Sequence, residues 1–340
     1  MNAAVPTTAQ PPLLELRQVA RSFGRHSDWL ERMAIRAGWT RQPPTVRAVD
    51  GVDLEIREGE VVGLVGESGC GKSTLGRMVA GLLEPSSGEV VWRGRGRSEM
   101  NAAEQRAAQL QVAMVFQNPF ASLNPRLRVR EIVGEAPRVH GLLQDGEEDA
   151  YVDRMLRQAG LDPALKQRYP HEFSGGQRQR IGIARALAVR PQLLVCDEAV
   201  AALDVSIQAQ ILNLFMEMRA TLGLTYLFIS HDLGVVEHLS DRVAIMYLGR
   251  IVEEAPAEAV FARPNHPYTQ ALLEEVPRID TRRRSFAFLK GELPSPLRPP
   301  PGCHFHTRCP HVMPRCREEA PALKTVAPGH RSACHLNDQA

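Results

Sequence analysis

The sequence lacks the features that mark several large classes of protein. Its 41 Lys and Arg nearly cancel its 39 Asp and Glu, so a net charge of +2 gives no general reason to expect a nucleic-acid partner. No segment reaches the roughly 18 to 20 consecutive apolar residues that a membrane-spanning helix needs, and the N-terminus resembles no secretion signal. Internal repeats and heptads are also absent. The remaining composition, 44% hydrophobic and 24% charged, is that of a globular chain, which we expect in the cytosol.

Changes of composition along the 340 residues indicate where the folded part begins and ends. Residues 1–12 are rich in Ala, Pro and Thr and are expected to be disordered. Residues 25–45 carry two Trp and a Pro-Pro pair without clean periodicity, which predicts an insertion or a short helix on a loop. Prolines crowd the chain after about residue 255. We therefore expect one large domain over residues 13–254 and a loop-rich extension over residues 255–340.

Hydrophobic periodicity predicts an α/β order for the large domain. Residues 52–56 alternate apolar and acidic side chains as in a half-buried strand, and residues 61–65 form an apolar run typical of a buried strand. Further buried strands are predicted at residues 193–196 and 226–230, whereas residues 118–172 favour helices and loops. We expect a mostly parallel sheet with a helical subdomain. The helix predicted after residues 61–65 has an apolar face made of Leu75, Met78, Val79 and Leu82.

A glycine-rich loop connects the buried run at residues 61–65 to that helix. Residues 66–73 read Gly-Glu-Ser-Gly-Cys-Gly-Lys-Ser, a full match to the phosphate-loop pattern in the strand, loop and helix context that the pattern needs. Glycines let backbone N–H groups converge on phosphate oxygens, Lys72 supplies a charge to the β- and γ-phosphates, and Ser73 can ligate Mg²⁺. The predicted ATP-binding residues are Gly66, Glu67, Ser68, Gly69, Cys70, Gly71, Lys72, Ser73 and Thr74.

Two carboxylates, Asp197 and Glu198, end the predicted strand that begins at Leu193. In a parallel sheet this strand end lies beside the phosphate loop. Asp197 is then placed to hold the Mg²⁺ shell, as the corresponding carboxylate does in phosphate-loop ATPases, while Glu198 is free to polarise the attacking water. A kinase or a GTPase uses the same loop, so these elements alone leave the reaction open.

The tetrapeptide Ser-Gly-Gly-Gln at residues 174–177 narrows the choice among these classes of phosphate-loop enzyme. The order of phosphate loop, tetrapeptide and Asp-Glu strand resembles the ATP-binding-cassette (ABC) family, whose signature is Ser-Gly-Gly-Gln. The resemblance covers residues 13–253 and implies a RecA-like phosphate-loop core with a mostly parallel sheet, an antiparallel β subdomain and a helical signature subdomain. Two cassettes of this family meet head to tail. The residues implied to contact the ATP of a partner chain are Ser174, Gly175, Gly176 and Gln177.

Other positions match further motifs of the same family. The resemblance implies that Asp204, in the D-loop, passes the state of one site to the other, and that His231, the switch histidine, contacts the γ-phosphate. It also suggests Phe23 as the aromatic side chain that stacks on adenine, and a place in the core explains Phe23 equally well. The residues implied to be catalytic are Glu198, His231 and the Q-loop residue Gln117. The implied Mg²⁺ ligands are Ser73, Gln117 and Asp197.

Three stretches resemble the ATPase subunits of oligopeptide and dipeptide importers, a branch that includes nickel importers. They are residues 115–125, residues 204–210 and the tail over residues 266–336. The resemblance implies an ATPase on the cytoplasmic face of the cell membrane, bound to integral-membrane permease subunits, paired with a second ABC ATPase and served indirectly by a substrate-binding protein. The alternative is a soluble ABC ATPase that acts on the ribosome or DNA. The single set of motifs, the lack of heptads and the near-neutral charge disfavour it.

Four of the six cysteines lie in the extension, at positions 303, 309, 316 and 334. Their spacing differs from the paired C-x₂-C of zinc ribbons, and no disulfide is expected in the cytosol. Four thiolates in a loop-rich segment suggest a metal or a cluster that supplies folding energy. In the branch that the chain resembles, such a quartet carries a [4Fe-4S] cluster, with zinc or reduced thiols as alternatives. The candidate ligands are Cys303, Cys309, Cys316 and Cys334.

Overall fold

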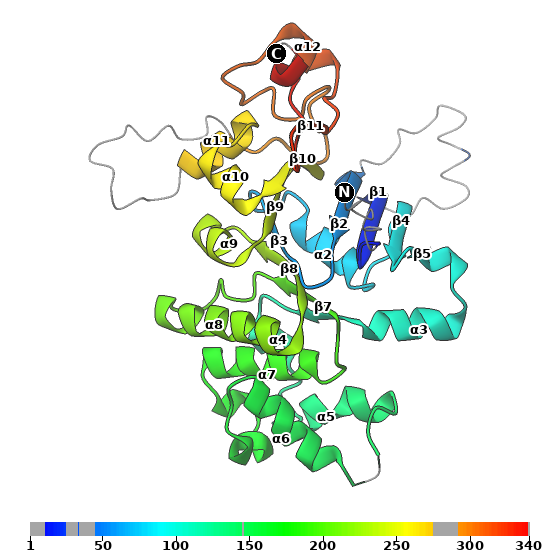
Figure 1. Ribbon diagram of the computed structural model, residues 1–340, viewed down its shortest axis with the longest axis vertical. Coiled ribbons are helices and arrows are strands. Elements are labelled where there is room, and N and C mark those ends of the chain that lie inside the picture. The colour runs from blue at the N-terminus through cyan, green and yellow to red at the C-terminus, as the bar shows by residue number, and fades with distance from the viewer. Residues whose placement is uncertain (1–10, 25–32, 34–44, 145, 275–291, 339–340) are drawn as a thin grey trace, which may run out of the picture.

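A large mixed sheet runs through the middle of the molecule in the computed structural model shown in Figure 1, which describes residues 11–24, 33, 45–144, 146–274 and 292–338. The disorder expected over residues 1–12, apart from positions 11 and 12, and the insertion or helix expected at residues 25–45, apart from positions 33 and 45, fall outside this described part. The sheet has eight strands, in the spatial order β11 (Lys324–Ala327), β12 (His330–Ser332), β10 (Arg250–Pro256), β9 (Arg242–Tyr247), β3 (Val61–Val65), β8 (Thr225–Ser230), β7 (Leu193–Asp197) and β6 (Val112–Val115).

Five neighbouring strands of this sheet, from β9 to β6, pair in parallel, and the pairs from β9 to β11 are antiparallel. Every residue of β3, β7 and β8 is buried, because both faces of these strands are covered. The predicted α/β core with a mostly parallel sheet is thus confirmed. The helices on one face include α8 (Val205–Leu222) and α9 (Leu233–Leu239), as Figure 1 shows.

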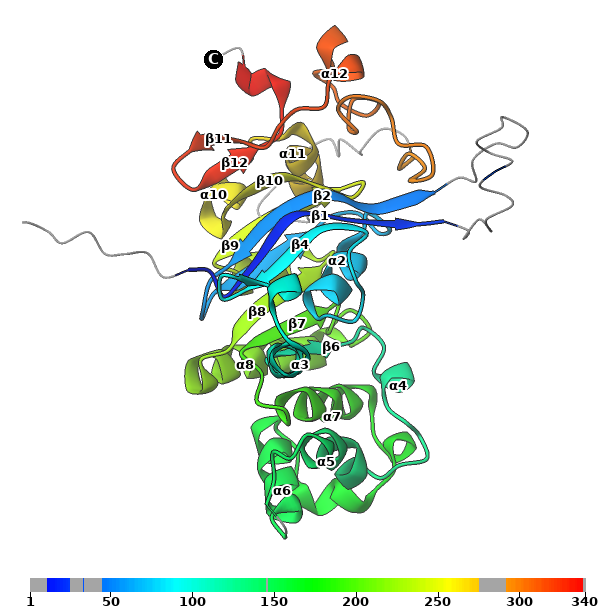
Figure 2. The same cartoon turned by 90° about the vertical axis from the view of Figure 1, so that its right-hand side faces the viewer.

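A smaller antiparallel sheet covers the other face. Its strand order is β2 (Val46–Ile56), β1 (Leu14–Phe23), β4 (Ser87–Trp92) and β5 (Arg95–Gly96). Helix α2 (Lys72–Val79) lies between the two sheets, and α3 (Ala102–Leu110) lies beside β6 (Figure 2). Apolar side chains from β1, β2, α2, β3 and β7 form one continuous core in this layer. That core fixes α2, and with it the phosphate loop, against the parallel strands.

One prediction about α2 is wrong, because Leu82 does not belong to its apolar face. Leu75, Met78 and Val79 are buried as expected, but the helix ends at Val79. Gly81 then adopts a left-handed φ of 67°, a conformation that glycine reaches without steric cost, and the chain turns away. Leu82 is exposed as a result.

The helical subdomain lies at the end of the molecule opposite to the extension (Figure 1). It packs apolar faces of three helices around residues such as Val133, Val152 and Ile183. Its elements are α4 (Pro119–Ser122), α5 (Val129–Val139), α6 (Glu148–Gln158), two 3₁₀ turns (Pro163–Gln167 and Pro170–Glu172) and α7 (Gly175–Leu187). The expected helical signature subdomain is therefore present.

The extension is joined to the main sheet. Strand β12 pairs with β10 through Glu253 opposite Ser332, so the sheet continues past residue 255 into the proline-rich region. Aromatic and aliphatic side chains from β9, β10 and the extension, Phe305 among them, share a third core. The other elements of the extension are α10 (Ala257–Ala262), α11 (Pro267–Glu274), α12 (Pro314–Glu318) and a 3₁₀ turn (His335–Asp338).

Candidate nucleotide site

The phosphate loop follows β3 and leads into α2, as its sequence pattern requires. Gly71 has a φ of 111°, and a Cβ at this position would lie 2.0 Å from the carbonyl oxygen of Ala48. A Cβ on Gly66 would lie 2.1 Å from the carbonyl oxygen of Met246. Both approaches are far closer than atoms tolerate, so glycine is needed at each position for the loop to lie against its neighbours.

Lys72 and Ser73 are held by hydrogen bonds at the start of α2. The Nζ of Lys72 donates to the carbonyl oxygens of Gly66 and Glu67 at 2.7 and 2.9 Å, so the charge of this buried side chain lies inside the loop. The Oγ of Ser73 donates to Oδ1 of Asp197 at 2.8 Å. Burial raises the pKa of Asp197, and this hydrogen bond partly offsets the rise. The sheet thus brings the predicted serine and aspartate of the Mg²⁺ shell together.

Glu198 forms a second cluster with Gln117 and His231. Nε2 of Gln117 donates to Oε2 of Glu198 at 2.5 Å, and Nδ1 of His231 lies 3.4 Å from Oε1 of the same carboxylate. Glu198 has a φ of 48°, which is uncommon for a residue with a Cβ and recurs where a site imposes an unusual geometry. The three residues expected to be catalytic therefore meet, although they come from three different parts of the chain.

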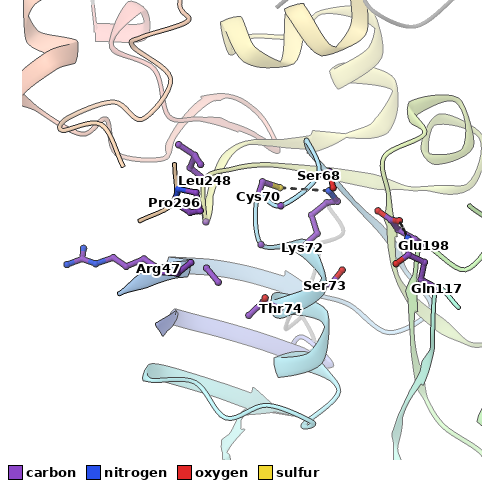
Figure 3. A pocket seen from close by; sticks show the side chains of 15 residues that line it. Arg47, Ser68, Cys70, Lys72, Ser73, Thr74, Gln117, Glu198, Leu248 and Pro296 are labelled. Atoms are coloured by element: carbon purple, nitrogen blue, oxygen red, sulfur yellow. Dashed lines mark hydrogen bonds between the residues drawn. The ribbon is translucent and has the colours of Figure 1, made fainter. Parts of the chain in front are cut away.

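A cavity of about 230 Å³ lies against the phosphate loop and is lined by Gln117 and Glu198 but not by Asp197 or His231. Gln117 and Glu198 lie on one side of the phosphate loop, and Arg47, Leu248 and Pro296 lie on the other (Figure 3). No sequence motif predicted Arg47, Leu248 or Pro296 as cavity residues. They belong to β2, to the turn between β9 and β10, and to the extension, respectively. The predicted residues that line it are Ser68, Gly69, Cys70, Gly71, Lys72, Ser73, Thr74, Gln117 and Glu198.

The signature and the D-loop lie elsewhere in the described chain. Helix α7, which the signature begins, is separated from α2 in both Figure 1 and Figure 2. Ser174 and Gln177 form a reciprocal cap, with Ser174 Oγ accepting from the Gln177 N–H at 3.3 Å and Gln177 Oε1 accepting from the Ser174 N–H at 3.1 Å. Asp204 caps α8 by accepting from the N–H of Ile207 at 3.0 Å. Neither the signature residues 174–177 nor Asp204 lines the cavity at the phosphate loop.

Phe23 ends β1 with 43% of its surface exposed, which excludes the core position that was the alternative for it. It is paired in register with Val46, whose neighbour Arg47 lines the cavity. The guanidinium of Arg21 lies over the Phe23 ring, 5.1 Å from its centroid. The Phe23 side chain is accessible to solvent, and its stacking on adenine stays a prediction.

The four cysteines of the extension lie within electrostatic reach of one another. Burial raises the pKa of Cys303 to about 11, and the thiols of Cys316, Cys309 and Cys334 add to the rise. The N–H of Cys303 donates to the carbonyl oxygen of Cys316 at 2.9 Å. Among the described residues, however, no three His, Cys, Asp or Glu side chains are grouped as a single metal ion requires. The structure thus does not show the zinc site suggested as one alternative.

The fold and the site together define a phosphate-loop ATPase. The family profile described as "ABC transporter" matches residues 49–201, and the profile described as "Oligopeptide/dipeptide transporter, C-terminal region" matches residues 252–316. The oligopeptide transport ATP-binding protein AppF of Bacillus subtilis (strain 168) is 49% identical over 332 residues, which are 96% of this chain and 98% of that protein. The putative oligopeptide transport ATP-binding protein YkfD of the same organism is 49% identical over 96% of this chain and 95% of its own.

Solved structures give the same result. The chain resembles cbiO1 from Clostridium perfringens, described as part of the ABC transporter complex cbiONQ, with a TM-score of 0.60 and 27% identity over 74% of this chain and 92% of that one. The ATP-binding cassette MJ0796, in a dimeric post-hydrolysis state bound to ADP and Pi, matches with the same score and identity over 72% of this chain and 98% of its own. The chain belongs to the ATP-binding proteins of ABC transporters, in the oligopeptide transport family. In the described part of the chain, no helix is both long and apolar enough to cross a bilayer.

Proposed function

We propose that this ATPase energises the import of peptides, bound from the cytoplasmic face to permease subunits in the cell membrane. The observation that carries the proposal is the 49% identity to an oligopeptide transport ATP-binding protein along nearly the whole of both chains, the C-terminal region included. The alternative of a soluble ABC ATPase on the ribosome or DNA is not favoured, because the relatives carry transport names and the net charge is only +2.

The geometry supports a division of labour in ATP hydrolysis. Lys72 neutralises charge on the β- and γ-phosphates, and the backbone N–H groups at the start of α2 bind phosphate oxygens. Glu198 accepts a proton from the attacking water and is oriented by Gln117 and His231. Ser73 and Asp197 supply the oxygen ligands that Mg²⁺ prefers, and they already lie 2.8 Å apart. The metal ion, when bound, neutralises phosphate charge.

The proposal requires a second cassette, identical or homologous, because the signature does not reach the phosphate loop of its own chain. Ser174 and Gln177 are exposed, and Val205, next to Asp204, leaves 83% of its apolar side chain exposed. An exposed apolar residue beside two polar motifs is typical of a surface that a partner covers. The dimeric form of MJ0796 bound to ADP and Pi supports the same arrangement.

A second surface lies beside the Q-loop and fits a permease. Phe120 on α4 is 62% exposed, and the guanidinium of Arg178 on α7 lies 3.9 Å from its ring centroid. A short permease helix that packs on this patch would contact the Q-loop and the signature helix together, so that closure of the cassettes moves the permease.

We also propose a [4Fe-4S] cluster on the four cysteines of the extension, which would hold this segment together. Four cysteine thiolates are the ligand set that a [4Fe-4S] cluster takes, and each of the other three cysteines lies close enough to Cys303 to affect its pKa. Protein purified without oxygen should contain about four iron and four sulfide per chain, and Cys316→Ser should lower both. Zinc in place of iron, or neither, would refute the cluster.

The proposed function can be tested by affinity purification of the tagged chain from detergent-solubilised membranes, followed by mass spectrometry. We expect permease subunits and a second ABC ATPase. Phe120→Asp should lose the permease and retain ATP binding, whereas Leu222→Asp, at an exposed apolar residue at the end of α8, should retain both. Recovery only with ribosomal or DNA-bound partners would overturn the transport assignment.

A further inference from the structure

The second residue of the phosphate loop, Glu67, is held from the C-terminal extension at two atoms. Its backbone N–H donates to the hydroxyl oxygen of Tyr268 on α11 at 2.9 Å. Its side-chain Oε1 accepts from Nη1 of Arg308 at 2.7 Å. Tyr268 and Arg308 lie 201 and 241 residues further along the chain, so neither contact follows from the local sequence of the loop.

The groups that hold Glu67 are themselves rigidly placed. Tyr268 is fully buried, with its ring 4.6 Å from that of Tyr247 and 5.4 Å from that of Phe305, measured between centroids. Only 5% of the Arg308 side chain is exposed, and the backbone N–H of Arg308 donates to the carbonyl oxygen of Phe305 at 3.0 Å. A guanidinium buried to this extent loses less conformational freedom on binding the carboxylate than an exposed one, and water screens the pair less than it screens a surface pair.

Glu67 also takes part in holding the lysine of the loop. Its carbonyl oxygen accepts from Lys72 Nζ at 2.9 Å and from the N–H of Cys70 at 3.3 Å. A displacement of Glu67 therefore moves both the anchor of the Lys72 ammonium and the backbone that follows. The path from the extension to the phosphate-binding groups is two contacts long.

We propose that Tyr268 and Arg308 are positioning residues for ATP binding and hydrolysis, which hold the phosphate loop in its binding geometry through Glu67. The extension thereby becomes part of the nucleotide site, and any change in the segment between Cys303 and Cys309, which carries Arg308, reaches the phosphates. The inference rests on the phosphate-loop assignment proposed above. A purely structural role for Arg308 would affect folding of the extension and leave ATP affinity unchanged.

The test compares ATP affinity and thermal unfolding in full-length variants, with a fluorescent ATP analogue as the probe. Arg308→Gln should weaken binding about tenfold, since hydrogen bonds to charged groups contribute that much, and Arg308→Lys should restore part of it. Tyr268→Phe, which removes only the hydroxyl, should weaken binding about fivefold. The matched control is Arg315→Gln, because Arg315 pairs with Glu319 and Asp338 within the extension. Its affinity should equal that of the unmodified chain.

A double-mutant cycle tests whether Arg308 acts through Glu67. The pair Glu67→Gln and Arg308→Gln together should bind ATP no more weakly than Glu67→Gln alone. Fully additive losses, or a lower unfolding temperature with unchanged affinity, would overturn the inference. If Arg308→Gln does not fold, Tyr268→Phe decides, and unchanged affinity in that variant overturns it as well.

The variant Lys72→Ala separates this inference from the assignment on which it rests. Loss of ATP binding in Lys72→Ala together with normal binding in Arg308→Gln and Tyr268→Phe would defeat the positioning role alone. Normal binding in Lys72→Ala would defeat the phosphate-loop assignment itself.

Discussion

Glu253, a fully buried carboxylate on β10, is expected to dock the C-terminal extension on the main sheet. Its oxygens accept hydrogen bonds from His330 Nε2 at 2.7 Å, from the N–H of Asn265 at 2.7 Å and from the N–H of His266 at 2.9 Å. One side chain thus joins β10 to β12 and to the turn before α11. Glu253→Ala leaves three donors without this acceptor in a buried site, and removing one partner of a buried charged network typically costs about 3 to 5 kcal/mol.

Chemical denaturation of the full chain measures that cost, and hydrogen exchange over residues 324–332 locates it. Glu253→Gln keeps one acceptor oxygen and should lose less stability than Glu253→Ala. The matched control is Glu258→Ala, an exposed glutamate in the first turn of α10, where the loss should stay below about 1 kcal/mol. If Glu253→Ala costs no more than the control, or if exchange in β11 and β12 is unchanged, the docking role is refuted.

Three further predictions concern the nucleotide site and its support. Glu198→Gln should retain ATP binding while hydrolysis at its site in the assembled transporter falls at least about 10²-fold, and near-normal single-turnover rates would contradict its role as base. Gly71→Ala should abolish binding of a fluorescent ATP analogue, because its Cβ would meet the Ala48 carbonyl oxygen at 2.0 Å and its φ is 111°; a normal Kd would show that the loop adjusts. Burial lowers the pKa of His266 from 6.5 to about 4, so the unfolded chain binds more protons between these values. Stability should therefore fall as the pH drops from 6.5 to 4, by up to about 3 kcal/mol, and His266→Gln should flatten this part of the denaturation profile.

The phosphate loop and its surroundings were accessible from sequence because their geometry is local. A buried strand, glycines at positions that need them and a helix beginning at Lys72 are encoded within about 20 residues. The parallel arrangement of the strands also predicts which residues meet. Because β3 and β7 belong to one sheet, Ser73 and Asp197 lie near each other at its edge. The signature could be recognised as a motif, but only the folded chain shows that Ser174 caps a helix away from its own phosphate loop.

The contacts of the extension were decided by tertiary structure alone. The prolines of that region predicted loops, yet β12 pairs with β10 and extends the main sheet. Arg308 and Tyr268 meet Glu67, and Pro296 meets the cavity, through packing that no short pattern records. Local sequence determines local conformation through dihedral preference and periodicity, whereas contacts across 200 residues depend on which apolar faces cover each other when the whole chain folds.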